Sequence, residues 1–223
     1  LATSREGLNI TGEQIYRISP LAFPKQSASA PDEAAKYGAV ALFANRVRAR
    51  DLRFEVTAEN VGSVVEICRL LDGLPLALEL AAARASVLSP REICDRLEAA
   101  FDFPTVDQHA SVSRHATMRA VIDWSYGLLS SQAQLLFDRL AVFSGGFTLE
   151  TATTVCTDEA LRPQDVLESL SSLVGQSLVM TNFVHGTTRY HLLETTRQYA
   201  LEKLTERGER HTMGRCHTLA LLR

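Results

Sequence analysis

The chain has 223 residues, of which 46% are hydrophobic and 22% are charged, and its formal net charge is −3. This composition is ordinary for a folded globular protein, and the net charge excludes a general attraction to nucleic acid. No apolar run approaches the ~20 residues that cross a bilayer, and no signal-peptide pattern is present, so we expect no membrane partner. Four scattered cysteines without metal-ligand spacing predict reduced thiols and a cytoplasmic protein: Cys68, Cys94, Cys156 and Cys216.

Residues 1–30 have mixed character. A short strand end comes first, and an alternating segment at Ile15–Ile18 predicts a second strand before a proline-rich loop. The chain begins at Leu1 in the strand end and stops at Arg223 inside an apolar helical pattern. We therefore expect it to be an interior piece of a longer protein.

From Asp32 to residue 103 the apolar residues recur with helical spacing, which predicts four amphipathic helices in a compact bundle. One helix is expected to open on a capping box at Ser89–Glu92, with proline at its first position.

A corner between two of these helices is formed by Gly73, Leu74 and Pro75. Glycine ends a helix because it tolerates positive φ, and proline is accepted at the first position of the next helix. Such a corner presents an apolar surface and a proline ring, which suits contact with a flat heterocycle. Most corners of this kind are structural, so both interpretations stay open.

A polar linker is expected after residue 103, followed by a long helix that ends near residue 130. Three helices are then predicted at 131–143, 149–156 and 163–174, and two apolar segments around Gly186 form a hairpin signal. Three helices followed by a hairpin predict a winged helix. A last helix from Glu194 ends at Gly208.

Five segments, taken in order, resemble the NB-ARC class of STAND signalling ATPases, and are most similar to bacterial LuxR/AfsR-type transcriptional regulators. They are Leu-Ala-Thr-Ser-Arg (1–5), Gly-Leu-Pro-Leu-Ala (73–77), Ser-Tyr-Gly-Leu-Leu (125–129), Leu-Ala-Val-Phe-Ser-Gly-Gly-Phe (140–147) and Leu-Leu-Glu-Thr-Thr-Arg-Gln-Tyr-Ala (192–200).

With this resemblance, the predicted fold is mainly α, in five parts. They are the remnant of an α/β nucleotide-binding domain (1–30), a four-helix bundle (31–103), a linker and connecting helix (104–130), a winged-helix domain with a β-hairpin wing (131–207), and the start of a following helical region that could open a repeat (208–223).

The resemblance implies a segment that closes over ADP or ATP and relays the nucleotide state to output domains. It implies that Arg5 approaches the terminal phosphate and that the Gly73–Pro75 corner packs on adenine. Leu193 and Glu194 occupy the place where many relatives carry a His-Asp pair that senses ADP; here that histidine is absent. Arg5 as a surface arginine, and Glu194 as a carboxylate favoured at a helix N-terminus, are the structural alternatives.

No phosphate-binding loop and no paired carboxylates for Mg²⁺ occur in the chain. We therefore expect no catalysis and no nucleotide bound by this segment alone. Its expected partners are an upstream P-loop domain of the same chain and downstream helical-repeat or helix-turn-helix output domains.

Two other functions stay open: a nucleotide-independent helical interaction scaffold and a winged-helix DNA-binding module. Residues 158–176 carry four carboxylates (Asp158, Glu159, Asp165, Glu168) against Arg162. An acidic reading helix is repelled by DNA phosphates, so the sequence predicts no direct nucleic-acid binding by this segment.

Overall fold

The computed structural model describes residues 10–14, 16, 18–24, 30–101, 110–184 and 186–222, with the side chains of 101, 110–115 and 184 left out. Arg5 lies outside the described residues. The described part is mainly helical, as predicted, with a two-stranded antiparallel sheet. Its elements are α1 (Pro31–Ala34), α2 (Gly38–Arg48), α3 (Val61–Leu70), α4 (Pro75–Ala82), η1 (Ala83–Ser86), α5 (Pro90–Phe101), α6 (Ala110–Gly127), α7 (Ser131–Leu140), α8 (Leu149–Cys156), α9 (Pro163–Gly175), β1 (Met180–Val184), β2 (Thr187–His191), α10 (Glu194–Glu206) and α11 (Arg210–Leu221).

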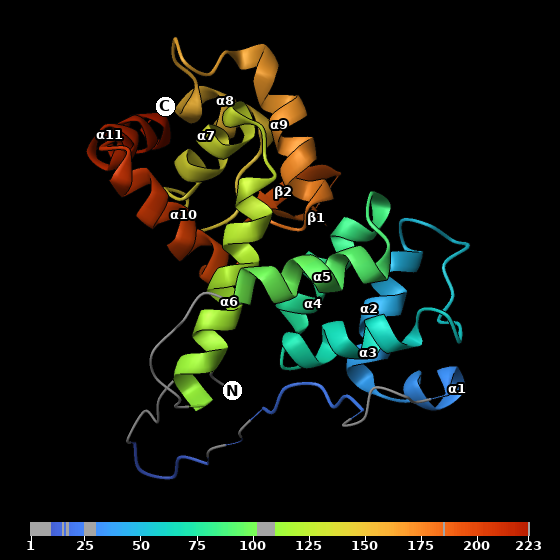
Figure 1. Ribbon diagram of the computed structural model, residues 1–223. Helices are drawn as coiled ribbons and strands as arrows, with labels where there is room; N and C mark the ends of the chain where they lie inside the picture. The colour runs from blue at the N-terminus through green and yellow to red at the C-terminus, as the bar shows by residue number, and fades with distance from the viewer. Residues whose placement is uncertain are drawn as a thin grey trace.

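Figure 1 shows two lobes joined by α6. In the lower lobe, α2 packs on α4 and α3 packs on α5. In the upper lobe, α7 packs on α9 and α10, and α11 packs on α8. Helix α6 contacts α4 and α5 on one side and α10 on the other, so it ties the lobes together. Buried apolar side chains of both lobes form a continuous core cluster.

The capping box at the start of α5 is confirmed. The Ser89 backbone N–H donates to Glu92 Oε2 at 2.8 Å, and the Glu92 N–H donates back to Ser89 Oγ at 3.3 Å. Each side chain satisfies an amide that the helix itself leaves unpaired. A second reciprocal cap, between Thr148 and Thr151, opens α8 and was not predicted.

Three local predictions are wrong. Tyr16 and Ile18 are exposed and belong to no strand. A strand needs a bonded neighbour, and neither residue pairs with β1 or β2. The helix expected from Asp32 is two helices, because Tyr37 takes an extended conformation before Gly38. Helix α6 already begins at Ala110, inside the expected polar linker.

Three of the four cysteines, Cys68, Cys94 and Cys156, are buried, and all four are free thiols. Burial raises the pKa of Cys68 and of Cys156 to about 12, which keeps both protonated near neutral pH. They behave as small apolar core residues, as the sequence predicted.

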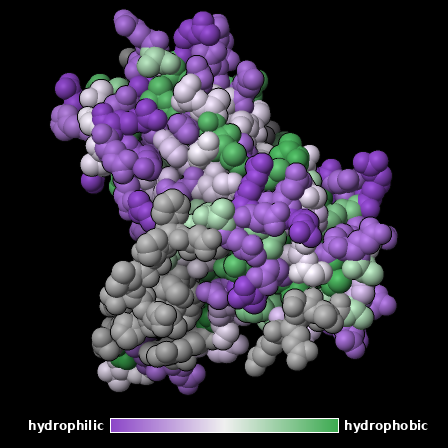
Figure 2. All heavy atoms as spheres, in the orientation of Figure 1, coloured by the Kyte–Doolittle hydropathy of each residue, from purple (hydrophilic) through white to green (hydrophobic). Residues whose placement is uncertain are grey.

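Polar side chains cover most of the face in Figure 2, with apolar side chains in scattered patches. Among the described residues, no helix has the length and apolarity that a membrane crossing requires. The described part also holds no group of three or more His, Cys, Asp or Glu side chains placed to bind a metal ion.

Candidate nucleic-acid interface

The third helix of the upper lobe, α9, has a buried face and an outward face. Val166, Leu170 and Leu173 pack into the core, as the helical spacing predicted. Leu167 is apolar too, but it is 55% exposed because it falls on the outward face. The outward face therefore carries a mixture of polar and apolar side chains, namely Gln164, Leu167, Glu168 and Ser171.

Two of the four carboxylates near α9 are neutralised by arginines. Arg162 Nε donates to Asp165 Oδ2 at 2.9 Å, and this bond lowers the pKa of Asp165. Asp158 accepts a hydrogen bond of 2.7 Å from Arg139, which comes from α7. Counting charges along residues 158–176 missed this ion pair, because Arg139 lies in another helix.

Arg139 is a buried strut beneath the turn that leads into α9. Its side chain is 1% exposed and donates to Asp158 Oδ2, Glu209 Oε2 and the Cys156 carbonyl oxygen, each at 2.7 Å. Burial opposes its charge, but the bonds to both carboxylates raise the pKa of Arg139 overall. The same bond lowers the pKa of Asp158 to about 2. One side chain thereby fixes α7, the end of α8 and the start of α11.

The predicted hairpin forms the wing, but both strands lie closer to the turn than the apolar segments at 177–181 and 189–193 indicated. Ser177 adopts a positive φ of 58°, which turns the chain before β1 begins at Met180. In the register Met180 pairs with His191 and Val184 pairs with Thr187. The predicted turn glycine, Gly186, has a φ of 79°.

Two contacts fasten the wing to the loop after α7. Phe147 and Tyr190 exchange backbone hydrogen bonds of 2.8 Å in both directions, which adds a short third pairing beside β2. Arg189 Nη2 donates to the Gly146 carbonyl oxygen at 2.8 Å. The wing is therefore held in place, while Thr181, Asn182, Phe183, Thr187 and Arg189 remain exposed on it.

The predicted adenine contact lies in the lower lobe, at the corner between α3 and α4. Gly73 has a φ of 62°, and a Cβ there would lie 2.1 Å from the Leu21 carbonyl oxygen. The Leu21 N–H donates to the Gly73 carbonyl oxygen at 3.0 Å. Leu74 is half-buried, whereas Pro75 is exposed at the first position of α4. The corner is thus rigid, and its proline ring faces outward.

Leu193 and Glu194 lie in the upper lobe, where Leu193 is the N-cap residue of α10. Glu194 accepts two hydrogen bonds of 2.9 Å from Arg197 and one of 3.0 Å from Gln198, in the next turn of the same helix. The structure thus places the predicted site residues in two groups, the corner of the lower lobe and the start of α10, with Arg5 outside the described residues.

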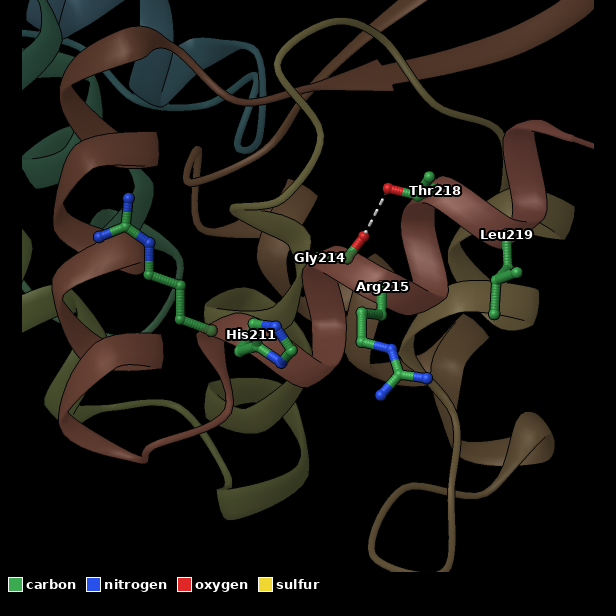
Figure 3. A pocket seen from close by; sticks show the side chains of 6 residues that line it. His211, Gly214, Arg215, Thr218 and Leu219 are labelled. Atoms are coloured by element: carbon green, nitrogen blue, oxygen red, sulfur yellow. Dashed lines mark hydrogen bonds between the residues drawn. The ribbon is translucent and has the colours of Figure 1, made fainter.

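A shallow surface pocket lies along α11. It is lined by Arg210, His211, Gly214, Arg215, Thr218 and Leu219. Figure 3 shows Arg215 and Leu219 projecting from the helix and Thr218 donating to the Gly214 carbonyl oxygen at 3.0 Å. Helix α11 packs on α8 rather than on α9, so this basic surface is separate from the third helix and wing.

Comparison with known proteins identifies the upper lobe. Residues 129–205 match the family model of a winged helix-turn-helix domain. The chain is 45% identical over 209 residues to the protein named "Putative HTH-type transcriptional regulator Rv0890c" of Mycobacterium tuberculosis and to the similarly named Mb0914c of Mycobacterium bovis. It is 39% identical over 210 residues to the uncharacterized protein Rv0894 of Mycobacterium tuberculosis. These matches cover 94% of this chain but 22% of the first two proteins and 50% of the third.

The prediction of no direct nucleic-acid binding is therefore contradicted. A winged helix-turn-helix domain, in a chain whose relatives are named as HTH-type regulators, points to direct DNA binding. The charge argument rested on net charge alone, whereas Asp158 and Asp165 are engaged in ion pairs with Arg139 and Arg162. Base edges as well as phosphates also attract side chains. The upper lobe of this chain is a winged helix-turn-helix domain.

Proposed function

We propose that residues 129–205 bind duplex DNA and that the chain is the DNA-binding segment of a transcriptional regulator. The winged helix-turn-helix match carries this proposal. In such domains a recognition helix enters the major groove, and the surrounding elements contact the phosphate backbone. Helix α9 is the third helix of the lobe and leaves a continuous outward face free of the core.

The outward side chains of α9 have the chemistry of base recognition. Gln164 can bond adenine in a bidentate manner, Leu167 can contact a thymine methyl group, and Ser171 can donate or accept. Glu168 can accept a hydrogen bond from the amino group of cytosine. An acidic side chain on this helix thus favours particular bases while it weakens general attraction to phosphate.

The wing supplies the complementary contacts. Arg189 and the hydroxyls of Thr181 and Thr187 are exposed on the hairpin, and side chains of these types bind phosphate oxygens. Because Phe147 and Tyr190 bond the wing to the rest of the lobe, binding DNA there requires little ordering.

The test is fluorescence anisotropy with labelled duplex DNA over a salt series. We expect affinity to fall as salt rises, because phosphate contacts release counterions. Glu168→Lys should raise non-specific affinity roughly tenfold at low salt, since it replaces a repulsion with an attraction. The plot of the logarithm of the binding constant against the logarithm of the salt concentration should also become steeper, by about 0.9 in slope.

The matched control is Glu59→Lys, which makes the same charge change at an exposed turn of the lower lobe. It should leave the affinity nearly unchanged. Equal gains from both substitutions would mean that net charge, and not α9, controls binding. Absence of any binding at low salt would reject the proposal.

The second candidate function is nucleotide-dependent regulation, as the family resemblance implies, and the exposed corner favours it. Pro75 is outward-facing on a backbone that Gly73 and Leu21 hold rigid, which suits stacking against a purine. In this proposal ADP or ATP binds in a longer protein that carries a phosphate-binding loop, and its exchange changes how the winged helix is presented.

This second proposal is tested in such a longer protein by Pro75→Gln. We expect weaker ADP binding by calorimetry together with an unchanged unfolding transition, because the proline ring is exposed. Unchanged ADP affinity would remove the corner from the nucleotide site. This outcome would leave the DNA-binding proposal intact.

A further inference from the structure

The junction between the two lobes contains a buried arginine with unused hydrogen-bond donors. Arg84, in η1, is 4% exposed, and its Nε and Nη2 atoms have no hydrogen-bond partner among the described residues. Its guanidinium carbon lies 5.8 Å from the ring centre of Trp124 in α6. The aromatic contact offers no hydrogen-bond acceptor to these two buried nitrogens, which is costly for a charged group.

Other arginines add positive charge beside it. Arg50 lies just beyond α2, and α2 contacts η1, which holds Arg84. Burial first, and then the positive charge of Arg50, lower the pKa of Arg84 to about 10. Arg46, one turn earlier, bonds Glu79 at 2.9 Å. The carboxylate of Glu79 is therefore engaged by Arg46, and Arg84 and Arg50 share a surplus of positive charge.

One of these arginines, Arg50, also contacts the winged helix. Arg50 Nη2 donates to the Gly175 carbonyl oxygen at 2.8 Å, at the end of α9, and contacts Ser177 Oγ at 3.3 Å. Gln176, between these two residues, has a buried and unpartnered Oε1 atom. Polar groups that lack partners thus occur on both lobes where they meet.

We infer that Arg84 and Arg50 form a binding site for a small phosphate-bearing ligand at the junction of the helical bundle and the winged helix. Guanidinium groups match phosphate oxygens in geometry and stay charged near neutral pH. Two cations in a partly dehydrated setting favour a doubly charged group over a carboxylate. The burial of Arg84 selects a small ligand over the backbone of a DNA duplex.

This site is distinct from both surfaces discussed above. Arg84 lies beyond the C-terminal end of α4, whereas the Gly73–Pro75 corner lies at its N-terminal end. It is also separate from the outward face of α9, although Arg50 holds the end of that helix. A ligand bound at this site would therefore alter the contacts between the two lobes.

The test is thermal unfolding and calorimetry of the whole chain with inorganic phosphate, comparing wild type with Arg84→Met. At phosphate ten times above the Kd, the wild-type midpoint should rise by about 3–6 °C. Arg84→Met should lose most of this rise and bind phosphate at least about tenfold more weakly. Without phosphate its midpoint should equal or exceed the wild-type value, because an unpaired buried charge has been removed.

Two further variants make the result specific. Arg84→Lys keeps the charge and should retain part of the phosphate response. Arg91→Met removes an exposed arginine from α5 and should respond to phosphate as wild type does. Phosphate also stabilises proteins by exclusion from their surface, but that effect acts equally on all variants.

ADP is the second probe and distinguishes the source of the phosphate group. ADP binding that is weakened by Arg84→Met identifies a nucleotide as the carrier, whereas a response to phosphate alone identifies free phosphate. Wild type and Arg84→Met responding equally to both probes, or no saturable binding to wild type, would overturn the inference.

Discussion

Replacing Arg139 with methionine should destabilise the winged helix more than any exposed ion pair can. The substitution removes a charge that is 1% exposed and its bonds to Asp158, Glu209 and the Cys156 carbonyl oxygen. Breaking one side of a fully buried ion pair costs about 3–5 kcal/mol. Here the two carboxylates are 43% and 30% exposed and regain water, so we expect about 2–4 kcal/mol. That loss corresponds to roughly 5–15 °C in the unfolding midpoint.

The assay is urea unfolding followed by circular dichroism, with Arg162→Met as the matched control. Arg162 makes the same kind of bond to Asp165, but its side chain is 64% exposed, so its loss should cost at most about 1 kcal/mol. If the two variants lose equal stability, the buried bonds of Arg139 do not hold the lobe together as described.

Two more predictions follow from the backbone and from titration. Gly73→Ala should lower the free energy of unfolding by at least about 2 kcal/mol, because the new Cβ would meet the Leu21 carbonyl oxygen and φ at this position is positive. Gly208→Ala is the control: its φ is 75° but the space around it is open, so the loss in the same urea assay should be about 1 kcal/mol. The pKa of Asp158 is depressed to about 2, so its contribution to stability is complete above about pH 4 and is lost as the pH falls toward 2. The difference in unfolding free energy between wild type and Asp158→Asn should shrink over that range; a difference independent of pH would contradict the Arg139 bond.

Local signals in the sequence predicted most of the helices. Glycine and proline marked the corner at Gly73–Pro75, the capping box marked the start of α5, and Gly208 marked the end of α10. These signals work because each depends on one backbone conformation or on side chains within one turn. The hairpin around Gly186 was found for the same reason.

What the sequence did not reveal depends on contacts between distant residues. Arg139 and Asp158 are 19 positions apart, and Arg50 and Gly175 are 125 positions apart. The one local hint was a pair of charges, Asp138 and Arg139, inside an otherwise apolar helical run. Without the partner from α7, the segment around α9 looked predominantly acidic, and DNA binding was wrongly excluded.

The proposed DNA interface is tested most directly by amide hydrogen exchange of the whole chain with and without duplex DNA at low salt. Our account predicts that added DNA slows exchange in α9 and in the β1–β2 wing while α2, α3 and α11 exchange as before. Protection centred on Arg210–Leu219 of α11, with none on α9 or the wing, would contradict it.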